Sequence, residues 1–253
     1  MIVRLLLLAG VVLCSGAGSS LAEAREFRAR YEASLLGLPI GRADFSSRFE
    51  GENFALSGRF ASAGIARIFD RTDGTTAVQG RFTRSGVQPD AYRLNYTSGK
   101  KRQKTEIDFS GGRVTKTLNV PKPKKRGRNW IPVADEHLVG VADPLSAMLI
   151  RAANSDEVCN RTLKVYDGEI RVDLVLRKAS DSESLGSGTV TCRARFVPVS
   201  GYRKNRSAIQ FLRDRSKILI AFAPVGQGGI HSPVEASVGT EIGTVRIRAY
   251  PAE

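Results

Sequence analysis

The chain has 253 residues, with 39 Lys or Arg against 25 Asp or Glu, so its formal net charge is +14. After residue 24, no stretch is apolar over the about 20 residues that a membrane-spanning helix needs. This excludes a bundle of transmembrane helices. The chain is long enough to bury a substantial core.

The first 24 residues have the layout of a secretory signal peptide. Arg4 precedes an apolar run from Leu5 to Leu13, and Ala22-Glu23-Ala24 satisfies the small-x-small cleavage rule. We expect cleavage before Arg25, with cleavage after Ala22 as the second choice. A membrane anchor is the alternative, but the apolar run supplies only roughly half of the length required. The predicted domains are a signal peptide over 1–24 and a single exported β-rich domain over 25–253, with no transmembrane segment after cleavage.

Alternating apolar and polar residues dominate the chain from residue 25 onward, and this period predicts strands with one buried face. The alternation is clearest in FRARYEASL, EIRVDLVLRK and GTVRIRAY. Turn signals recur at intervals of roughly a dozen residues, which is typical of an antiparallel meander. So wide a sheet curls. We therefore predict an all-β dominated fold, either a strongly curved antiparallel sheet or a partly open β-barrel.

One or two short helices are also predicted. In ADPLSAMLIRAAN, Asp143 is a good N-cap, Pro144 suits the first helical position, and apolar residues follow at helical spacing. We expect a helix over 143–153, packed on the concave face of the sheet. A second, weaker helical segment covers 61–70.

Two cysteines, Cys159 and Cys192, remain after the signal peptide. An oxidising compartment favours a disulfide between them. Each lies in an alternating segment, so we expect two strands that lie side by side. Metal binding is the competing interpretation, but two cysteines without nearby histidines cannot complete a zinc site. We predict no metal and no cofactor.

The basic residues gather between 100 and 128, where eleven cations face only Glu106 and Asp108. Inside a cell this would favour nucleic acid, but export argues against nucleic acid as a partner. A lipid headgroup, the phosphates of lipopolysaccharide or an acidic envelope protein remain, with a solvated connector as the alternative. The candidate contacts with an anionic surface lie in VPKPKKRGRNWIP, at Lys122, Lys124, Lys125, Arg126 and Arg128.

No catalytic motif stands out. The sequence has no Gly-x-Ser-x-Gly elbow and no calcium-loop spacing, and its two histidines, His137 and His231, are far apart along the chain. We expect His137 to be a polar connector residue and His231 to belong to a turn. No residue is predicted to be catalytic, and the protein is predicted not to be an enzyme.

Several segments resemble one family of exported bacterial proteins, in the same order over nearly all of the mature chain. They are YEASLLGLPIG, IPVADEHLVGVADPLSAML, CNRTLKVYDGEIRVDLVL, GTVTCRARFVPVSGYR and PVEASVGTEIGTVRI. The family is domain of unknown function 3108. The resemblance implies a β-rich envelope protein of Gram-negative bacteria and a periplasmic location. It also implies the pairing of Cys159 with Cys192, and it brings no catalytic residues.

The leading functional hypothesis is a non-enzymatic envelope protein. It would bind a lipid or a lipoprotein acyl group in the concave face, or dock on an anionic envelope surface. The alternatives are a hydrolase of cell-wall or lipid substrates and a scaffold for other envelope proteins. An apolar cavity of several hundred Å³ would favour binding, whereas a cluster of His231 with an acid and a serine would favour catalysis.

Overall fold

The computed structural model describes residues 25–251 apart from 70, 85, 124–126 and 227; the predicted signal peptide, 1–24, lies outside the described residues. The strands are β1 (Arg25–Leu35), β2 (Leu38–Glu50), β3 (Asn53–Ser62), β4 (Thr72–Thr83), β5 (Gly86–Ser98), β6 (Lys101–Ser110), β7 (Arg113–Val120), β8 (Trp130–Ile131), β9 (Ile150–Arg151), β10 (Arg161–Tyr166), β11 (Arg171–Lys178), β12 (Val190–Ser200), β13 (Tyr202–Arg203), β14 (Ile218–Pro224), β15 (Ile230–Thr240) and β16 (Gly243–Pro251). The helices are α1 (Ala66–Phe69), α2 (Ser155–Cys159) and α3 (Ser207–Asp214), and the 3-10 turns are η1 (Asp135–Leu138), η2 (Ser146–Met148) and η3 (Asp181–Glu183).

One antiparallel sheet of 14 strands contains nearly all of the strands, in the order β10-β11-β12-β14-β15-β16-β1-β2-β3-β4-β5-β6-β7, with β9 paired to β15. The first and last strands, β1 and β16, are neighbours in the middle of this sheet. The short strands β8 and β13 form a separate pair. The structure therefore confirms the predicted all-β fold with a wide antiparallel sheet.

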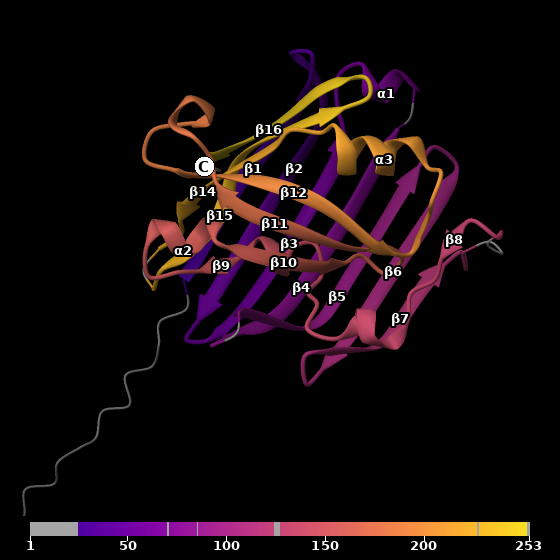
Figure 1. Ribbon diagram of the computed structural model, residues 1–253, viewed down its shortest axis with the longest axis horizontal. Coiled ribbons are helices and arrows are strands. Elements are labelled where there is room, and N and C mark those ends of the chain that lie inside the picture. The colour runs from indigo at the N-terminus through magenta and orange to yellow at the C-terminus, as the bar shows by residue number, and fades with distance from the viewer. Residues whose placement is uncertain (1–24, 70, 85, 124–126, 227, 252–253) are drawn as a thin grey trace, which may run out of the picture.

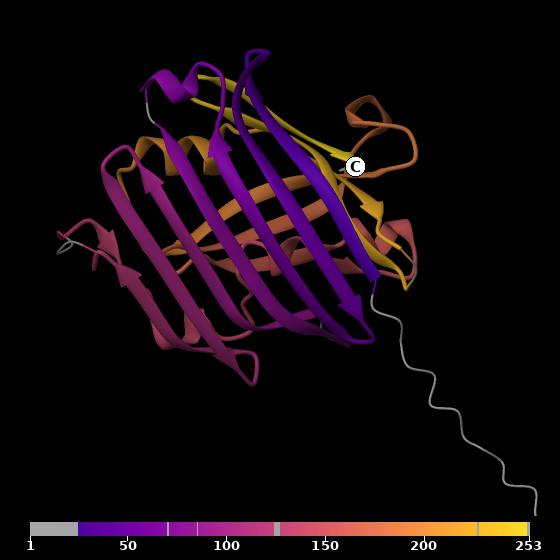
Figure 2. The ribbon, with the colours of Figure 1, turned by 180° about the vertical axis from the view of Figure 1, so that it is seen from behind.

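The sheet is strongly curved but not closed. Figures 1 and 2 show that the half formed by β10–β12 lies opposite the half formed by β2–β7, with the interior between them. The two edge strands are β7 and β10. The segment 139–142 bridges them: the Gly140 amide donates to the Gly112 carbonyl at 2.7 Å, and the Ala142 amide donates to the Lys164 carbonyl at 2.9 Å.

Strand alternation places the apolar side chains on the concave side, as the period of two predicts. One buried cluster centres on Phe49, Phe54, Phe82 and Ile107 in the β2–β6 half. A second centres on the disulfide and Phe222 in the β10–β14 half. The core is thus divided between the two facing halves of the sheet.

The prediction of a helix over 143–153 was wrong. Asp143 does act as a cap, because its Oδ1 accepts from the amides of Leu145 and Ser146 at 2.9 and 3.1 Å. Only the single 3-10 turn η2 follows, and Ile150 and Arg151 then form β9. Pairing of β9 with β15 replaces the helical hydrogen bonds. In this segment Ala147, Leu149, Ile150 and Ala152 are buried all the same, whereas Leu145 and Met148 are half-buried.

The weaker helical prediction over 61–70 holds only in part. Residues 61 and 62 still belong to β3, and α1 begins at Ala66 and ends at Phe69. The link 63–65 is fixed to β2, because the Ala63 amide donates to the Ile40 carbonyl at 3.0 Å. This tie holds α1 beside the start of β2.

The predicted disulfide between Cys159 and Cys192 is present, with Cα atoms 5.2 Å apart. Contrary to the expectation from the sequence, the two cysteines do not lie on neighbouring strands. Cys159 ends α2, and β10 is separated from β12 by β11. The bond therefore fastens a helix to the inner face of the sheet, and both cysteines are almost fully buried.

Candidate functional site

An apolar cavity opens on the concave side of the sheet where β16, β1, β2 and β3 run side by side. Its volume is about 880 Å³, which lies within the size range of small-molecule sites. Its walls carry mainly aliphatic and aromatic side chains from these strands and from the segment around α1. An apolar cavity of several hundred Å³ is the observation that the sequence analysis named as favouring ligand binding.

The cavity exists because small residues face inward on neighbouring strands. Ala33 lies opposite Gly41 in the β1–β2 register, and Ala43 lies opposite Phe60 in the β2–β3 register. A side chain added at Gly41 would contact the Cβ of Ala33 at 3.7 Å. Alanine and glycine cannot fill the space above the sheet, so the inner surface stays hollow there.

Two inward-facing glycines leave room for aromatic rings close to the backbone of the sheet. A Cβ at Gly58 would lie 2.4 Å from the ring of Phe45, and a Cβ at Gly74 would lie 2.4 Å from the ring of Phe60. Any larger residue would push these rings into the cavity. Both rings belong to its wall, so the glycines determine its shape.

Tyr31 provides a polar atom in this wall. Its hydroxyl donates to the Pro233 carbonyl at 2.7 Å, and its ring meets that of Phe45 edge-on at 5.6 Å. Burial raises the pKa of Tyr31 above its usual 10, so the phenol stays neutral. Arg42 is the charged residue among the described lining, and its side chain is exposed.

Exposed aliphatic side chains gather at the end of the molecule formed by the β1–β2 turn, the α1 segment and the β15–β16 turn. We call them the collar: they are Leu36, Leu38, Ile65, Ile68 and Ile242. Leu36 is 75% exposed, Ile68 80% and Ile242 73%. Ile65 and Ile242 also line the cavity, so part of the collar belongs to the cavity wall.

Three chain reversals bring the collar together. The β1–β2 turn, the α1 segment and the β15–β16 turn lie at the same end of the molecule, at the top of Figures 1 and 2. A Cβ added at Gly243 would lie 3.0 Å from the Leu36 side chain, and one added at Gly64 would lie 2.4 Å from the Pro39 carbonyl oxygen. The β1–β2 turn thus touches both of the other segments.

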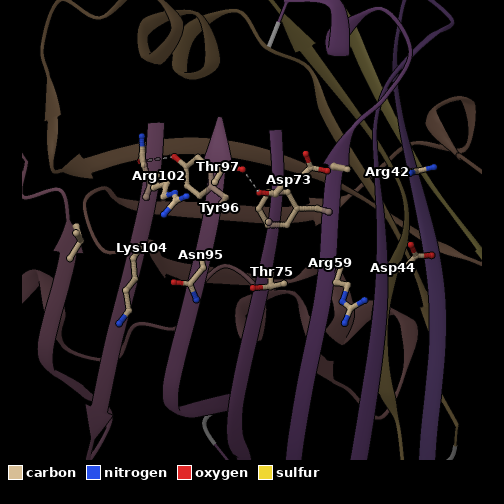
Figure 3. Close-up of a pocket in the computed structure, with 15 residues that line it drawn as sticks. Arg42, Asp44, Arg59, Asp73, Thr75, Asn95, Tyr96, Thr97, Arg102 and Lys104 are labelled. Carbon is tan, nitrogen blue, oxygen red and sulfur yellow. Dashed lines mark hydrogen bonds between the residues drawn. The ribbon is translucent and has the colours of Figure 1, made fainter. Parts of the chain in front are cut away.

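A polar groove of about 650 Å³ lies on the outer face of β2–β6 (Figure 3). The register sets out its side chains in two rows across β2–β6. The row nearer the collar contains Arg42, Ala61, Asp73, Thr97 and Arg102, and the next row contains Asp44, Arg59, Thr75, Asn95 and Lys104. Cations therefore border a floor of small and polar residues.

Ion pairs neutralise only part of this groove. Asp44 pairs with Arg30 at 2.9 Å, and Lys104 pairs with Glu106 at 2.5 Å. Within the described residues, Arg42, Arg59 and Arg102 form no ion pair. Three guanidinium groups remain available to an external anion.

The basic stretch predicted from the sequence is described only in part. Lys122 and Arg128 are exposed, in keeping with either a contact surface or a connector. Lys124, Lys125 and Arg126 lie outside the described residues. The structure does not bring Lys122 or Arg128 into the wall of the cavity or of the outer groove.

The two histidines do not meet. His137 lies in η1, where its Nδ1 accepts from the Ala134 amide at 3.1 Å. His231 lies in β15, with its Nδ1 3.1 Å from the Gly229 carbonyl oxygen. No group of three or more His, Cys, Asp or Glu in the described chain is arranged to hold a metal ion.

Sequence reasoning missed the collar and the three outer arginines. The collar had a faint signal, because the turn Leu36-Gly37-Leu38 carries leucines where polar residues are usual. Arg42, Arg59 and Arg102 are distant in sequence, and only the strand register brings them together.

These features define the class of protein: an open, barrel-like antiparallel sheet that holds an apolar cavity. No helix in the described part of the chain has the length and apolarity that a membrane crossing requires. The chain belongs to the family described as "Protein of unknown function (DUF3108)", whose sequence profile matches residues 26–250.

No curated protein matches the chain. Among solved structures, the chain is similar to the crystal structure of a β-barrel-like protein of domain of unknown function DUF1849 from Brucella abortus. The two share 12% sequence identity, with a TM-score of 0.46 over 89% of this chain and 96% of that chain.

Proposed function

We propose that the protein binds the acyl chain of a lipid or lipoprotein in the cavity formed by β16, β1, β2 and β3. The observation that carries the proposal is the apolar cavity of about 880 Å³, whose wall includes the exposed collar residues Ile65 and Ile242. Soluble proteins rarely leave so many aliphatic side chains together in water without a partner. We propose the periplasm as the location, because residues 1–24 have the layout of a signal peptide.

The size of the cavity suits a flexible hydrocarbon chain. Each methylene removed from water contributes about 0.8 kcal/mol, so ten buried methylenes contribute about 8 kcal/mol. That gain alone corresponds to a dissociation constant of about 1 μM, and burial of about five further methylenes of a long acyl chain offsets an ordering cost of about 4 kcal/mol. We therefore expect binding in the micromolar range.

The chemistry of the lining favours binding over hydrolysis. The described residues that line the cavity include no carboxylate and no imidazole. The hydroxyl of Tyr31 is engaged by the Pro233 carbonyl, and the raised pKa of Tyr31 opposes its use as a base at neutral pH. A hydrocarbon ligand needs none of these groups.

The test is native mass spectrometry combined with a fluorescent fatty-acid titration of the delipidated full chain. We expect a one-to-one adduct and a micromolar dissociation constant. The Ala43→Trp variant adds an indole to the cavity wall and should weaken binding at least about tenfold, the effect of losing about two buried methylenes. Protein purified from the cells that make it should carry the mass of a lipid.

The matched control is Ala55→Trp, which adds the same side chain on the adjacent strand β3. Ala55 is exposed on the outer face, so this variant should bind the probe as the unmodified chain does. Absence of any adduct from the unmodified chain, or equal weakening by the two tryptophan variants, would refute the proposal.

A further inference from the structure

The exposed aliphatic side chains of this protein are concentrated at one end. Among the described residues, eight large apolar side chains are exposed, and five of them form the collar. Scattered exposure is usual on protein surfaces, whereas a contiguous patch marks an interaction surface. The collar therefore needs a partner of its own, beyond a chain buried in the cavity.

The backbone at Leu36 supplies an independent observation. Leu36 is the described non-glycine residue with a positive φ, +52°, and it precedes Gly37 at φ +81°. Such a two-residue turn favours Asn-Gly, because leucine is strained in the left-handed region. The Leu36 side chain is 75% exposed, so packing within the fold does not explain why leucine is present.

Charge selects the partner. The outer row beside the collar includes Arg42 and Arg102, and Arg59 lies in the next row. Arg42 lines both the outer groove and the cavity. Unpaired arginines next to an apolar tip match a surface that has phosphates outside and hydrocarbon beneath.

The same charges argue against pairing of two collars. The chain has a formal net charge of +14, and a collar-to-collar dimer would bring the unpaired arginines of both copies together. Like charges at such an interface oppose association. A bilayer with anionic headgroups fits the same surface without this repulsion.

We propose that the collar docks on an anionic phospholipid bilayer, with Leu36 and Ile68 inserted among the acyl chains and Arg42, Arg59 and Arg102 at the headgroup phosphates. This inference rests on the proposed function, because docking in this orientation turns the mouth of the cavity toward the hydrocarbon. An acyl chain then passes between bilayer and cavity along an apolar path. Its exposure to water stays small during the transfer.

The experiment measures flotation of the full chain with vesicles of phosphatidylglycerol and phosphatidylcholine, and with vesicles of phosphatidylcholine alone. Leu36→Asp combined with Ile68→Asp should lower partition into the anionic vesicles by about a hundredfold, since two aliphatic tips lose their burial. The matched control is Val139→Asp, which changes an exposed valine outside the collar. It should partition as the unmodified chain does.

The arginines are tested in the same assay. Arg42→Gln, Arg59→Gln and Arg102→Gln together should lower partition into anionic vesicles at least about tenfold and abolish its salt dependence. The control removes three cations elsewhere, as Arg84→Gln, Arg113→Gln and Arg195→Gln. Arg84 and Arg113 lie at the turns of the opposite end of the strands. Equal losses from the two triple variants would overturn the assignment of the headgroup site.

The variant Leu36→Asn separates folding from docking. Asparagine tolerates the left-handed backbone better than leucine, so this variant should unfold at the same or a higher urea concentration while its vesicle partition falls. Unchanged partition would refute the docking role of Leu36. Neither Leu36 nor Ile68 lines the cavity.

Fatty-acid titration of the same variants distinguishes the two proposals. The collar variant Leu36→Asp, Ile68→Asp should keep its micromolar affinity for the soluble probe while it loses the vesicles. Flotation of this variant equal to that of the unmodified chain would overturn the docking surface and leave probe binding intact.

A collar-dependent dimer in analytical ultracentrifugation, without flotation, would assign the collar to a second copy and also overturn the proposal. Failure of the unmodified chain to bind the probe would instead refute the proposed function.

Discussion

Two parts of the sheet, β10–β14 and the part of β16–β3 around the cavity, differ in how their inner surfaces are filled. In the β10–β14 half, Phe222 and Leu176 are fully buried around the disulfide. In the β16–β3 part, Tyr31, Phe45 and Phe60 remain half-buried around a cavity. The same alternation of side chains therefore yields either a filled core or a hollow, according to the size of the residues that face inward.

Glycine and alanine make the difference. The hollow part places Gly58 and Gly74 on the inner face of β3 and β4, where aromatic rings from the neighbouring strand occupy the space that a side chain would need. The filled half places Cys192 and Ile220 in comparable inward positions of β12 and β14 and adds α2 above them. In this sheet the cavity therefore lies where the inward residues are small, and the packed core lies where α2 covers larger ones.

The largest effect on stability is expected when one phenylalanine in each part is replaced by alanine. Phe222→Ala should lower the free energy of unfolding by about 4 to 5 kcal/mol, because it leaves a closed void in a packed core. Phe60→Ala should cost about 2 kcal/mol, because it only widens a cavity that is already open to solvent. Urea denaturation measures both values. Equal costs would contradict the division into a filled and a hollow part.

The disulfide should contribute slightly less. Cys159 and Cys192 are 33 residues apart, so the loop-entropy relation predicts that their bond stabilises the fold by about 4 kcal/mol. Measured contributions of disulfides are often somewhat smaller than this relation predicts. The Cys159→Ala, Cys192→Ala variant should therefore unfold at a lower urea concentration. Its affinity for the fatty-acid probe should be unchanged while it is folded, because the bond lies in the filled half. Loss of probe binding by the folded variant, in the absence of urea, would show that the two halves are coupled.

A smaller effect on stability is expected from Gly58→Val in the hollow part. The new Cβ would lie 2.4 Å from the Phe45 ring and would turn that ring into the cavity. The ring can move toward open space, so the free energy of unfolding should fall by only about 1 to 2 kcal/mol. Probe affinity should fall at least about tenfold. A variant that keeps full affinity would show that Phe45 does not form the wall at which the chain binds.

Local patterns predicted much of the fold. Alternation predicted the strands and their inner faces, such as Phe27 to Leu35 in β1, and cysteine content predicted the disulfide. The helix over 143–153 failed because its helical spacing competes with a tertiary interaction, the pairing of β9 with β15. The pattern of apolar residues predicted that the segment is buried, but not that its backbone groups form hydrogen bonds with β15.

The candidate site depends on information that no single segment carries. The contact of Phe45 with Gly58 requires the β2–β3 register, and the collar requires three separate turns to meet. The basic stretch attracted attention because its charges are consecutive, whereas Arg42, Arg59 and Arg102 come from three strands. Sequence reasoning therefore placed its candidate contact surface in one continuous segment, whereas the strand register gathers the arginines of the outer groove from separate strands.

The smallest expected effect concerns acid stability in the filled half. Glu183 of η3 forms ion pairs with Arg193 of β12 and with Lys217, the latter at 2.8 Å. The hydrogen bond from Arg193 is the main cause that lowers the pKa of Glu183 from 4.5 to about 2, and the bond from Lys217 adds to it. A lowered pKa in the folded state means that the contribution to stability is present above pH 4.5. It is lost as the pH falls from about 4.5 toward 2.

The Glu183→Gln variant isolates this contribution. Its thermal midpoint should lie below that of the unmodified chain at pH 7, and the two midpoints should converge as the pH approaches 2, because protonated Glu183 and glutamine are both neutral. The probe affinity of both proteins should be the same at pH 7, since η3 lies far in the sheet order from the strands of the cavity. If the difference between the two midpoints is constant across this pH range, the ion pairs are not its cause, and the packing of η3 is.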